Sequence, residues 1–471
     1  MSSEKARDAS SVTNPPVTTF CDPSLFDYRE ADREVFEERF STFIPPNAFD
    51  AHAHIYDLRH ILTADEDNQS ARPEVDHAYL LESMQRWMGE HLITDGLYFP
   101  FPRTHVDPHV ANEFLAKALA DSPGSRGLML IRPQDDAAEA EAAIERHHFV
   151  GFKVYHVYAT RENTFHAECD EFIPQWAWEI ADQRGLAITL HMVLPHALRD
   201  PRNQQYIIEN CLRYPNARLI LAHAARGFNA LDTVLGIDTL RGLPNVYFDT
   251  SAICESAAFE AIVKACGPSR LMYGSDFPVS DSRGRSFNFG DGFCWLYEHN
   301  WQQIGAPSHG IPQLIGHESL AALQMACRNL GLNDRDVERI FCHNAREILG
   351  IDKPAGLQTT SAENGHARYR EARQRIPGGV QLLSKRPEMF APEVWPAYFE
   401  EAIGCEIVDY DGRRFLDMSH CGILSCLLGF ADPDVNQAVI RRVTLGNMAT
   451  QQTADEVRLA ELLIGIHPWA D

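Results

Sequence analysis

With 471 residues the chain exceeds one ordinary domain, so two or three domains are expected. The formal net charge of −24 repels phosphate backbones and anionic membranes, which excludes nucleic acid and membrane as expected partners and favours a small-molecule substrate. No run of about 18 apolar residues occurs and residues 1–20 contain no signal peptide, so we expect a cytoplasmic protein with reduced cysteines. The sequence is compatible with a homo-oligomer.

Residues 1–46 show no clear pattern and are expected to form an N-terminal arm with a helix over Tyr28–Phe40. From 47 to 351, eight apolar runs predict strands: Asn47–Asp50, Gly96–Phe99, Gly127–Ile131, Val150–Tyr155, Leu186–Leu190, Arg218–Ala222, Asn245–Phe248 and Arg270–Gly274. Helical periodicity lies between them: Val75–His91, His109–Ala120, Ala137–His147, Glu171–Gln183, Gln204–Arg213, Phe228–Leu240 and Ser256–Cys266, with His317–Leu330 and Asp334–Leu349 closing the unit.

Strands that are apolar throughout and separated by helices predict a parallel sheet covered on both sides. Eight repeats over roughly 300 residues favour an α/β fold of the closed (β/α)8 TIM-like barrel type. An open doubly wound sheet is the alternative, but no Gly-x-Gly-x-x-Gly follows any of the predicted strands.

Six chemically competent side chains fall on these strands or at their carboxyl ends: His52, His54, Lys153, His191, His223 and Asp276. Because strand side chains alternate, His52 and His54 face the same side, and in a barrel all carboxyl ends share one rim. Taken singly, each has a structural alternative: a hydrogen-bonded histidine, a rim lysine or a turn aspartate. Together, four histidines and an aspartate at strand ends indicate a functional site.

Residues 48–350 resemble the amidohydrolase superfamily, in particular the amidohydrolase-related group that also contains decarboxylases, hydratases and lactonases. The matching segments are FDAHAH (49–54), GFKVYH (151–156), TLH (189–191), LILAH (219–223), YGSDFP (273–278) and NAREILG (344–350). The resemblance implies that His52, His54 and His191 bind a divalent metal, with zinc expected. Asp276 would complete the shell or act as general base, and His223 would polarise or protonate the substrate.

Imidazole and carboxylate ligands suit zinc, and an open coordination position lowers the pKa of bound water to about 7. We therefore expect a hydrolase in which metal-activated water attacks a small carboxylated, lactone or amide substrate. A metal-dependent decarboxylase on the same site is the alternative. A barrel scaffold that serves only as an interaction module is the non-enzymatic alternative.

Lys153 has two interpretations within that resemblance. It is either carboxylated and bridges two metals, with His191 and His223 sharing the second, or it stands beside a single metal, which we favour. Arg226, three residues beyond His223, is the preferred holder of a substrate carboxylate, and a solvated arginine at the rim is its alternative. Arg103, Arg132 and Arg283 also follow strand ends, and the aromatic segment 280–316 is expected to cover the mouth as a lid or to pack on the rim.

Residues 352–366 have a linker composition. Beyond them, 367–471 predict an incomplete α+β segment: a helix at Ala367–Arg375, a hairpin of Cys405–Tyr410 and Arg414–Met418, and helices at Pro433–Val443 and Asp455–Ile466. The segments 375–380, 409–417, 428–433 and 453–463 resemble the N-terminal portion of class III PLP-dependent aminotransferases, most closely the glutamate-1-semialdehyde aminomutases.

PLP chemistry needs a Schiff-base lysine. Lys385 is the sole lysine after Lys353 and does not occupy the position that the family uses, so we expect no PLP-binding residue and no bound PLP in this chain. Two explanations stay open. The segment is a piece of a longer bifunctional protein with aminotransferase or aminomutase activity, or it is a docking module. We favour the first, because the absence of the large domain would remove half of the packing partner of this segment, and we therefore expect residues 367–471 to pack loosely.

Overall fold

The computed structural model describes residues 27–61, 74–298, 312–351, 365–419, 425–446, 449–467 and 469. By internal contacts the chain divides into two compact units, Met1–Pro354 and Ala355–Asp471. Each unit is described by itself. Most of the expected linker, residues 352–366, lies outside the described residues.

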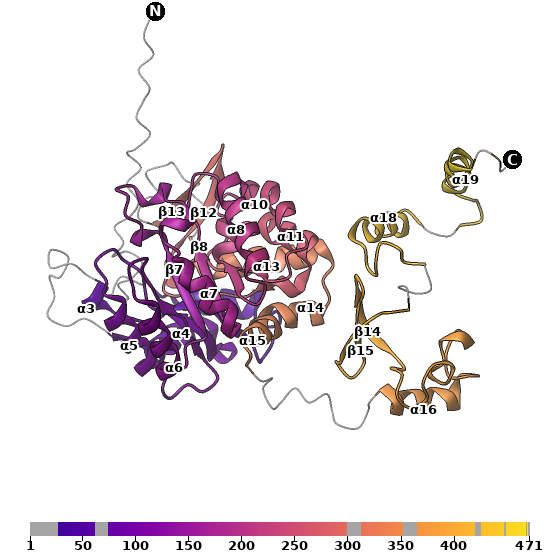
Figure 1. The fold of residues 1–471 in the computed structure, drawn as a ribbon, viewed down its shortest axis with the longest axis horizontal. Helices are drawn as coiled ribbons and strands as arrows, with labels where there is room; N and C mark the ends of the chain where they lie inside the picture. Colours follow the sequence, from indigo (N-terminus) through magenta and orange to yellow (C-terminus); the bar gives the residue numbers. More distant parts are fainter. Residues whose placement is uncertain are drawn as a thin grey trace, which may run out of the picture. The chain divides into compact units, whose positions relative to one another are not determined.

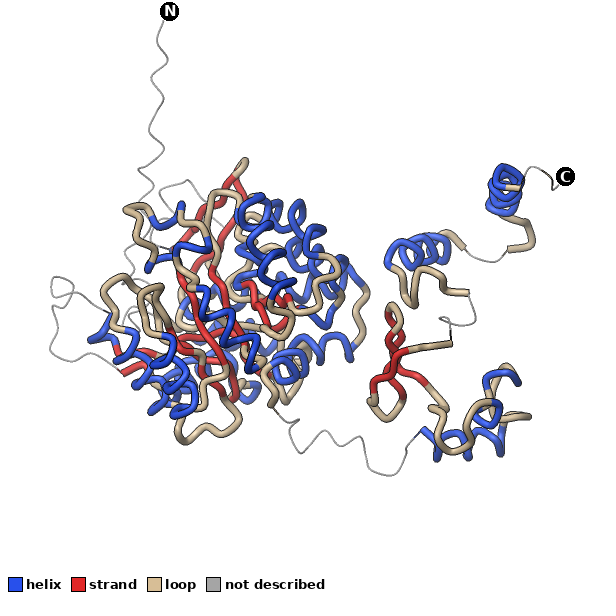
Figure 2. The backbone as a smooth tube through the Cα atoms, in the orientation of Figure 1, coloured by secondary structure: helices blue, strands red, loops and turns tan. Residues whose placement is uncertain are grey.

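In the first unit, parallel strands lie at the centre and helices surround them (Figures 1 and 2). The strands follow one another in space in the orders β1-β4-β5 and β6-β7-β8-β9-β10-β11, and every neighbouring pair is parallel. Their bounds are β1 Phe49–His54, β4 Asp95–Phe99, β5 Arg126–Gly127, β6 Met129–Leu130, β7 Gly151–Tyr155, β8 Ala187–His191, β9 Arg218–Leu221, β10 Val246–Asp249 and β11 Leu271–Met272.

Backbone hydrogen bonds join these strands into a ring. β5 and β6 are two halves of one expected strand, and between them the N–H of Leu128 donates to the carbonyl of Tyr98 at 2.9 Å. On the other side the N–H of Ala51 in β1 donates to the carbonyl of Tyr273, just after β11, at 2.8 Å. The expected α/β barrel of TIM type is therefore confirmed.

Alternation along the strands separates two apolar clusters. Phe49, Ala187 and Ile220 point into the barrel interior, where Ile348 and Leu349 from the last helix of the unit join them. Their neighbours on the same strands pack against the surrounding helices. Because Phe49 and Ala187 begin their strands, this apolar cluster fills the amino-terminal end of the barrel. The carboxyl end is left for polar side chains.

The covering helices follow the expected segments. Polar caps start several of them: Asp76, Asp107, Asp136, Asp200 and Asn229 each accept a backbone N–H of the first turn. Their bounds are α4 His77–Met88, α5 Pro108–Ala118, α6 Ala137–His147, α7 Gln175–Arg184, α8 Pro201–Arg213, α10 Ala230–Gly236, α11 Ser256–Cys266, α13 Ile315–Leu330, α14 Asp334–Glu338 and α15 Asn344–Ile348. Every helix among the described residues is too short or too polar to pass through a lipid bilayer.

The expected N-terminal arm contains a helix, α2 (Glu30–Arg39), that is packed into the barrel unit. Phe36 and Phe40 are fully buried, and the ring of Phe36 lies 5.7 Å from that of Trp87 in α4. Asp32, on the same helix, forms a buried ion pair with Arg283 at 2.8 Å. Residues 27–44 are thus part of the folded unit.

The aromatic segment expected over the barrel mouth contains an antiparallel hairpin, β12 (Gly284–Phe289) and β13 (Gly292–Tyr297). Phe293 and Trp295 share one face of β13, and their rings lie 5.1 and 5.4 Å from the ring of Phe228. At the hairpin tip, Asp291 pairs with Arg199 at 2.6 Å. Residues 299–311 of the expected segment lie outside the described residues.

In the second unit, β14 (Phe399–Ile403), β15 (Glu406–Asp409) and β16 (Arg414–Leu416) form an antiparallel sheet with helices α16 (Gly365–Arg375), α18 (Pro433–Thr444) and α19 (Asp455–Ile466). The expected hairpin between β15 and β16 is present, and its Gly412 takes the left-handed φ of 79° that such turns require. Among the described residues of this unit few side chains are buried: Tyr369, Pro387, Val408 and Asp409 are, whereas α19 buries none. This is consistent with the expected loose packing of the segment.

Candidate metal centre

Strand β1 brings two histidines to the carboxyl end of the barrel. Its pairing register with β4 shifts between Asp50 and Ala53, and within this irregular stretch the backbone N–H of His52 donates to Asp50 Oδ1 at 3.0 Å. Burial raises the pKa of Asp50 to about 6. His52 and His54 are buried as well, and their ring centroids lie 5.6 Å apart.

Asp276 lies beside both histidines because the chain after β11 runs along β1. The backbone N–H of Asp276 donates to the carbonyl of His52, and that of His54 donates to the carbonyl of Phe277, both at 2.8 Å. Gly274 permits this approach, since a Cβ there would lie 2.7 Å from the Cβ of His52. As a result Asp276 Oδ1 is 3.3 Å from His52 Nε2 and 3.6 Å from His54 Nε2.

The spacing of these three side chains fits one metal ion. One potential ligand atom from each of His52, His54 and Asp276 lies within 4.8 Å of the others. Ligand atoms placed about 2.1 Å from a tetrahedral ion are roughly 3.4 Å from one another, close to the 3.3 and 3.6 Å that separate Asp276 Oδ1 from the Nε2 atoms of His52 and His54. Among the residues that the structure describes, buried His52 Nε2 has no hydrogen-bond partner, which leaves its lone pair available. The donor set therefore suits zinc or a similar divalent ion.

The charges in this centre are set by burial and by neighbouring groups. Burial alone would raise the pKa of Asp276, but His223, His52 and His54 hold it well below its usual range, so the carboxylate is ionised. Burial lowers the pKa of both His54 and His223 to about 4, so these two rings are uncharged at pH 7. Burial opposes charge on His52 too, but Asp249 raises its pKa above the ordinary value.

Asp249, the last residue of β10, is a buried carboxylate to which the sequence pattern did not lead us. Its Oδ2 lies 2.8 Å from His52 Nδ1, and its Oδ1 accepts the backbone N–H of His223 at 2.8 Å. Burial would raise the pKa of Asp249, but His52 and several hydrogen bonds lower it to about 2. A signal was present, because Asp249 directly follows the predicted strand Asn245–Phe248 and so shares the rim of the other site residues.

His223 lies in a left-handed turn directly after β9. Residues 223–226 have φ angles of 56, 49, 61 and 58°, a conformation that costs non-glycine residues about 1–2 kcal/mol each. The turn is held by hydrogen bonds, among them Thr233 Oγ1 to the carbonyl of Ala224 at 2.8 Å. It places the ring of His223 4.9 Å from the ring of His52. The sequence predicted the position of His223 but not this backbone conformation.

His191, the last residue of β8, is at the same rim. Its ring centroid lies 5.0 Å from that of His223 and 4.4 Å from that of Tyr155. Burial holds the pKa of His191 well below its ordinary value, so the ring is neutral. The group of three within 4.8 Å does not include His191. The structure thus places this predicted ligand next to His223, and its coordination to the same ion stays a prediction.

Lys153 is fully buried in β7. Its Nζ lies 4.4 Å from the centroid of the Phe99 ring and, within the described part of the chain, has no hydrogen-bond partner. Burial lowers its pKa to about 8. Among the described residues the structure contains one group of three or more metal-competent side chains, that of His52, His54 and Asp276. Lys153 thus lies beside this rim, and whether it stands next to one ion or bridges two stays a prediction.

Three of the four candidate arginines take part in structural contacts. These contacts are Arg283 with the buried Asp32 at 2.8 Å, Arg132 with Asp135 at 2.9 Å, and Arg103 Nη1 with the carbonyl of Ile61 at 2.8 Å. All three hold segments of the barrel unit together.

Arg226 differs from them. Its guanidinium lies between two aromatic rings, 5.7 Å from the centroid of Phe165 and 5.9 Å from that of Phe293. Its Nη1 donates to the carbonyl of Leu194 at 3.2 Å. Its Nε has no partner, and no carboxylate pairs with the guanidinium within the described residues. A partly buried cation without a counter-ion is suited to bind an anionic group.

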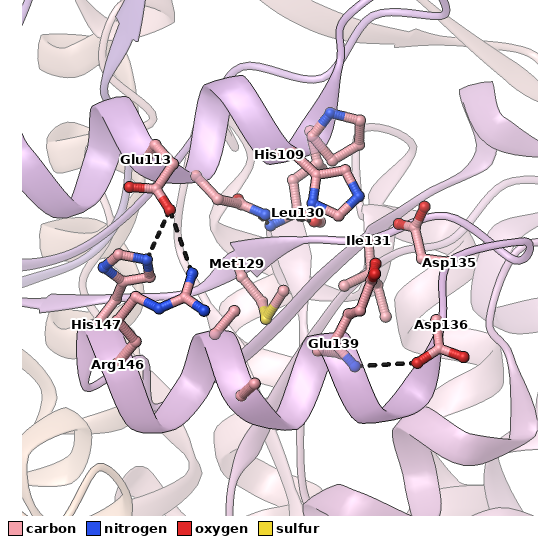
Figure 3. Close-up of a pocket in the computed structure, with 15 residues that line it drawn as sticks. His109, Glu113, Met129, Leu130, Ile131, Asp135, Asp136, Glu139, Arg146 and His147 are labelled. Carbon is pink, nitrogen blue, oxygen red and sulfur yellow. Dashed lines mark hydrogen bonds and ion pairs between the residues drawn. The ribbon is translucent and has the colours of Figure 1, made fainter.

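A cavity of about 400 Å³ is lined by other residues (Figure 3). It lies between α5 and α6, with Met129 and Leu130 of β6 among its lining residues. At one end Glu113 Oε1 lies 2.9 Å from His147 Nε2. None of the candidate site residues contributes to its walls, so we do not assign this cavity to the metal centre.

The fold and this site define a parallel α/β barrel with a candidate metal centre at its carboxyl rim. Residues 49–351, more than half of the 471-residue chain, match the family model described as Amidohydrolase. The chain therefore belongs to the amidohydrolase family. The resemblance expected for residues 48–350 is confirmed.

Individual relatives match more limited parts. L-fucono-1,5-lactonase of Burkholderia ambifaria is 29% identical over 188 residues, which are 36% of this chain and 55% of the lactonase. Glutamate-1-semialdehyde 2,1-aminomutase of Methanobrevibacter smithii is 34% identical over 104 residues, so that 22% of this chain spans only 23% of the aminomutase. Among solved structures, a probable 2-pyrone-4,6-dicarboxylic acid hydrolase of Acinetobacter baumannii with bound citric acid has a TM-score of 0.42 at 13% identity, over 64% of this chain and 99% of that chain.

Proposed function

We propose that the barrel unit is a metal-dependent hydrolase acting on a small carboxylated lactone or amide. The observation that carries this proposal is the buried group of His52, His54 and Asp276, whose ligand atoms lie within 4.8 Å of one another at the carboxyl rim. Membership of the amidohydrolase family supports it. His191 is proposed as a further ligand, since it ends the strand next to β9 at the same rim.

A bound divalent ion would supply Lewis-acid polarisation of a carbonyl and a lower pKa for water. The residues of the chain supply the proton transfers. The ionised Asp276 takes a proton from the water that attacks the carbonyl carbon. His223 is uncharged, and its ring lies beside Asp276, with Nδ1 3.8 Å from Oδ2. Its Nδ1 lies 3.1 Å from the carbonyl of Ser251, which can only accept, so the lone pair is on Nε2. His223 would take up a proton at Nε2 and deliver it to the leaving oxygen of a lactone or nitrogen of an amide.

Arg226 is proposed to bind the carboxylate of the substrate. Its guanidinium has no carboxylate partner within the described residues, and Phe165 and Phe293 flank it. The rings of Tyr155 and His191 lie 4.4 Å apart at the same rim. This arrangement favours an anionic substrate with an apolar body.

The ligand assignment is tested by metal content. Purified chain is loaded with excess Zn²⁺, desalted and analysed by mass spectrometry for metals. We expect about one equivalent in the wild type and less than about 0.1 in the double variant His52→Ala/His54→Ala, because two of the proposed ligands are gone. The matched control removes two exposed histidines, His109→Ala/His166→Ala, and should keep the full equivalent. A full equivalent in the first double variant would show that the ligands are elsewhere.

The reaction is tested with the metal-loaded chain and a panel of carboxylated lactones, carboxylated amides and aromatic carboxylates. Hydrolysis releases an acid without gas, whereas decarboxylation, the alternative on this site, releases carbon dioxide. Release of carbon dioxide with no turnover of lactone or amide would contradict the proposed hydrolase and favour the decarboxylase.

For residues 367–471 we propose a relation to the start of PLP-dependent aminotransferases. The 34% identity with the aminomutase over 104 residues supports it. Lys385 is the only lysine beyond Lys353, so this segment by itself is proposed to hold no PLP.

A further inference from the structure

The carboxylate of Asp249 lies at the centre of the site without facing the proposed metal position directly. It is fully buried at the end of β10, and each of its two oxygens has different hydrogen-bond donors. Oδ2 lies 2.8 Å from His52 Nδ1. Oδ1 accepts the backbone N–H groups of His223 at 2.8 Å and Ser251 at 3.2 Å, and the hydroxyl of Ser251 at 2.5 Å.

An ionised carboxylate only accepts hydrogen bonds, so His52 Nδ1 must carry the proton that joins it to Asp249. In a neutral imidazole one nitrogen is protonated and the other bears the lone pair. His52 Nε2 is therefore the lone-pair nitrogen, and it is this atom that lies 3.3 Å from Asp276 Oδ1 without a hydrogen-bond partner among the described residues.

The other oxygen of Asp249, Oδ1, contacts the part of the site that contains His223. By accepting the N–H of His223, Asp249 Oδ1 fixes the first residue of the left-handed turn 223–226. His223 Nδ1 in turn lies 3.1 Å from the carbonyl oxygen of Ser251 and 2.8 Å from its hydroxyl oxygen, whose proton is donated to Asp249 Oδ1. Both oxygens of Ser251 therefore accept from His223 Nδ1, and His223 Nε2 is also left with its lone pair.

We infer that Asp249 is a positioning residue of the metal centre: it fixes the tautomer in which His52 Nε2 is available to the metal, and it anchors the turn that carries His223. Asp249 touches neither metal nor substrate in this role. The inference rests on the proposed metal centre. General experience with ligating histidines is that loss of the carboxylate behind the ring costs about 10–100-fold in metal affinity.

Asp249→Asn gives a sharp test because the amide has one accepting and one donating end. Three donors converge on the position of Oδ1, so the amide oxygen should stay there and its NH₂ should face His52 Nδ1. That nitrogen must then accept, and the proton of His52 moves to Nε2, the atom meant for the metal.

The tautomers are measured by long-range ¹⁵N–¹H correlation in metal-free chain labelled with [¹⁵N]histidine, with the His52 signals assigned by their loss in His52→Gln. Because Asp249 raises the pKa of His52, the spectra are recorded over a series of pH values and the tautomer is read where the ring is neutral. We expect the Nδ1–H form of His52 in the wild type and the Nε2–H form in Asp249→Asn. Zinc affinity, measured by competition with a chelator, should fall by about 10–100-fold in Asp249→Asn.

Ser251→Ala is the matched control, since it leaves both oxygens of Asp249 in place. It removes one donor to Oδ1, together with the contacts of Ser251 Oγ to His52 Nδ1 at 3.2 Å and to His223 Nδ1 at 2.8 Å. It should keep the wild-type tautomer of His52 and a zinc affinity within a few-fold of the wild type.

Wild-type His52 in the Nε2–H form would overturn the inference, and this measurement does not depend on whether Asp249→Asn folds. The inference would also be overturned if folded Asp249→Asn kept the Nδ1–H form of His52 or the wild-type zinc affinity. The same holds if Ser251→Ala changed the tautomer and the zinc affinity as much as Asp249→Asn does. If the wild type binds no zinc, the proposed function is wrong. The measured tautomer of His52 then still tests whether Asp249 fixes it.

Discussion

Arg226 and His223 occupy one short turn but contact different partners. His223 lies against His52 and the carbonyl of Ser251, whereas the guanidinium of Arg226 lies between the rings of Phe165 and Phe293. The turn therefore divides the proposed tasks by residue, with proton transfer at His223 and binding of the substrate carboxylate at Arg226.

Replacing Arg226 tests that division. For a carboxylated substrate, Arg226→Met should raise KM by about 10–100-fold and leave kcat within a few-fold, because a charge-assisted hydrogen bond to a carboxylate is lost. The methyl ester of the same substrate should be hydrolysed equally well by both proteins. Arg241→Met, at an exposed arginine, is the control. Equal losses with acid and ester would assign Arg226 a structural role.

Helix α2 shows how an element with a weak sequence signal can be central to the fold. It buries Phe36 against Trp87, and its Asp32 forms two hydrogen bonds with Arg283, at 3.0 and 2.8 Å. Arg283 precedes β12, so α2 holds the base of the hairpin that covers Phe228.

Removing Asp32 should therefore destabilise the barrel unit strongly. Asp32→Ala removes the buried counter-ion of Arg283 and leaves it only the more exposed Glu298 at 4.0 Å, and breaking such a buried pair costs about 3–5 kcal/mol. Urea unfolding monitored by tryptophan fluorescence measures the loss. Glu34→Ala, at an exposed position of the same helix, should change the free energy of unfolding by less than about 0.5 kcal/mol. Similar midpoints for the two variants would contradict a stabilising role for the pair.

The strands and most of the site were predictable from the sequence for a local reason. Apolar runs of four to six residues ended in polar side chains, and a parallel barrel gathers such ends at one rim, which placed His52, His54, His191 and Asp276 together. Arg283 was wrongly grouped with possible substrate ligands, because its partner Asp32 is 251 residues away in sequence.

Other features of the site have no local signature. The left-handed turn 223–226 contains no glycine, the residue that normally marks such a conformation. Asp249 follows a predicted strand, but its role depends on facing His52 across the barrel, which only the folded structure shows.

At the scale of the whole molecule, all candidate site residues belong to the first compact unit, Met1–Pro354. A chain ending at Pro354 should therefore keep the zinc stoichiometry and affinity of the full chain, measured side by side. Loss of metal binding in the shortened chain, while its circular dichroism is preserved, would show that the second unit contributes to the site.

The second unit should not bind PLP as a Schiff base, since Lys385 is its only lysine and lies outside the position that the aminotransferase family uses. Full chain incubated with PLP and reduced with borohydride should carry no pyridoxyl label on residues 365–469, as read by peptide mass spectrometry. A stoichiometric label on Lys385 would contradict this expectation.

The turn 223–226 contains both the residue proposed for proton transfer, His223, and the residue proposed for substrate binding, Arg226. Since His223 and Arg226 are three positions apart in a loop with little conformational freedom, an insertion or deletion between β9 and α10 would displace both side chains at once. If His223 and Arg226 have the roles proposed above, exchanging the side chain at position 226 should change substrate preference alone, whereas changing the length of that loop should impair both reactivity and selectivity.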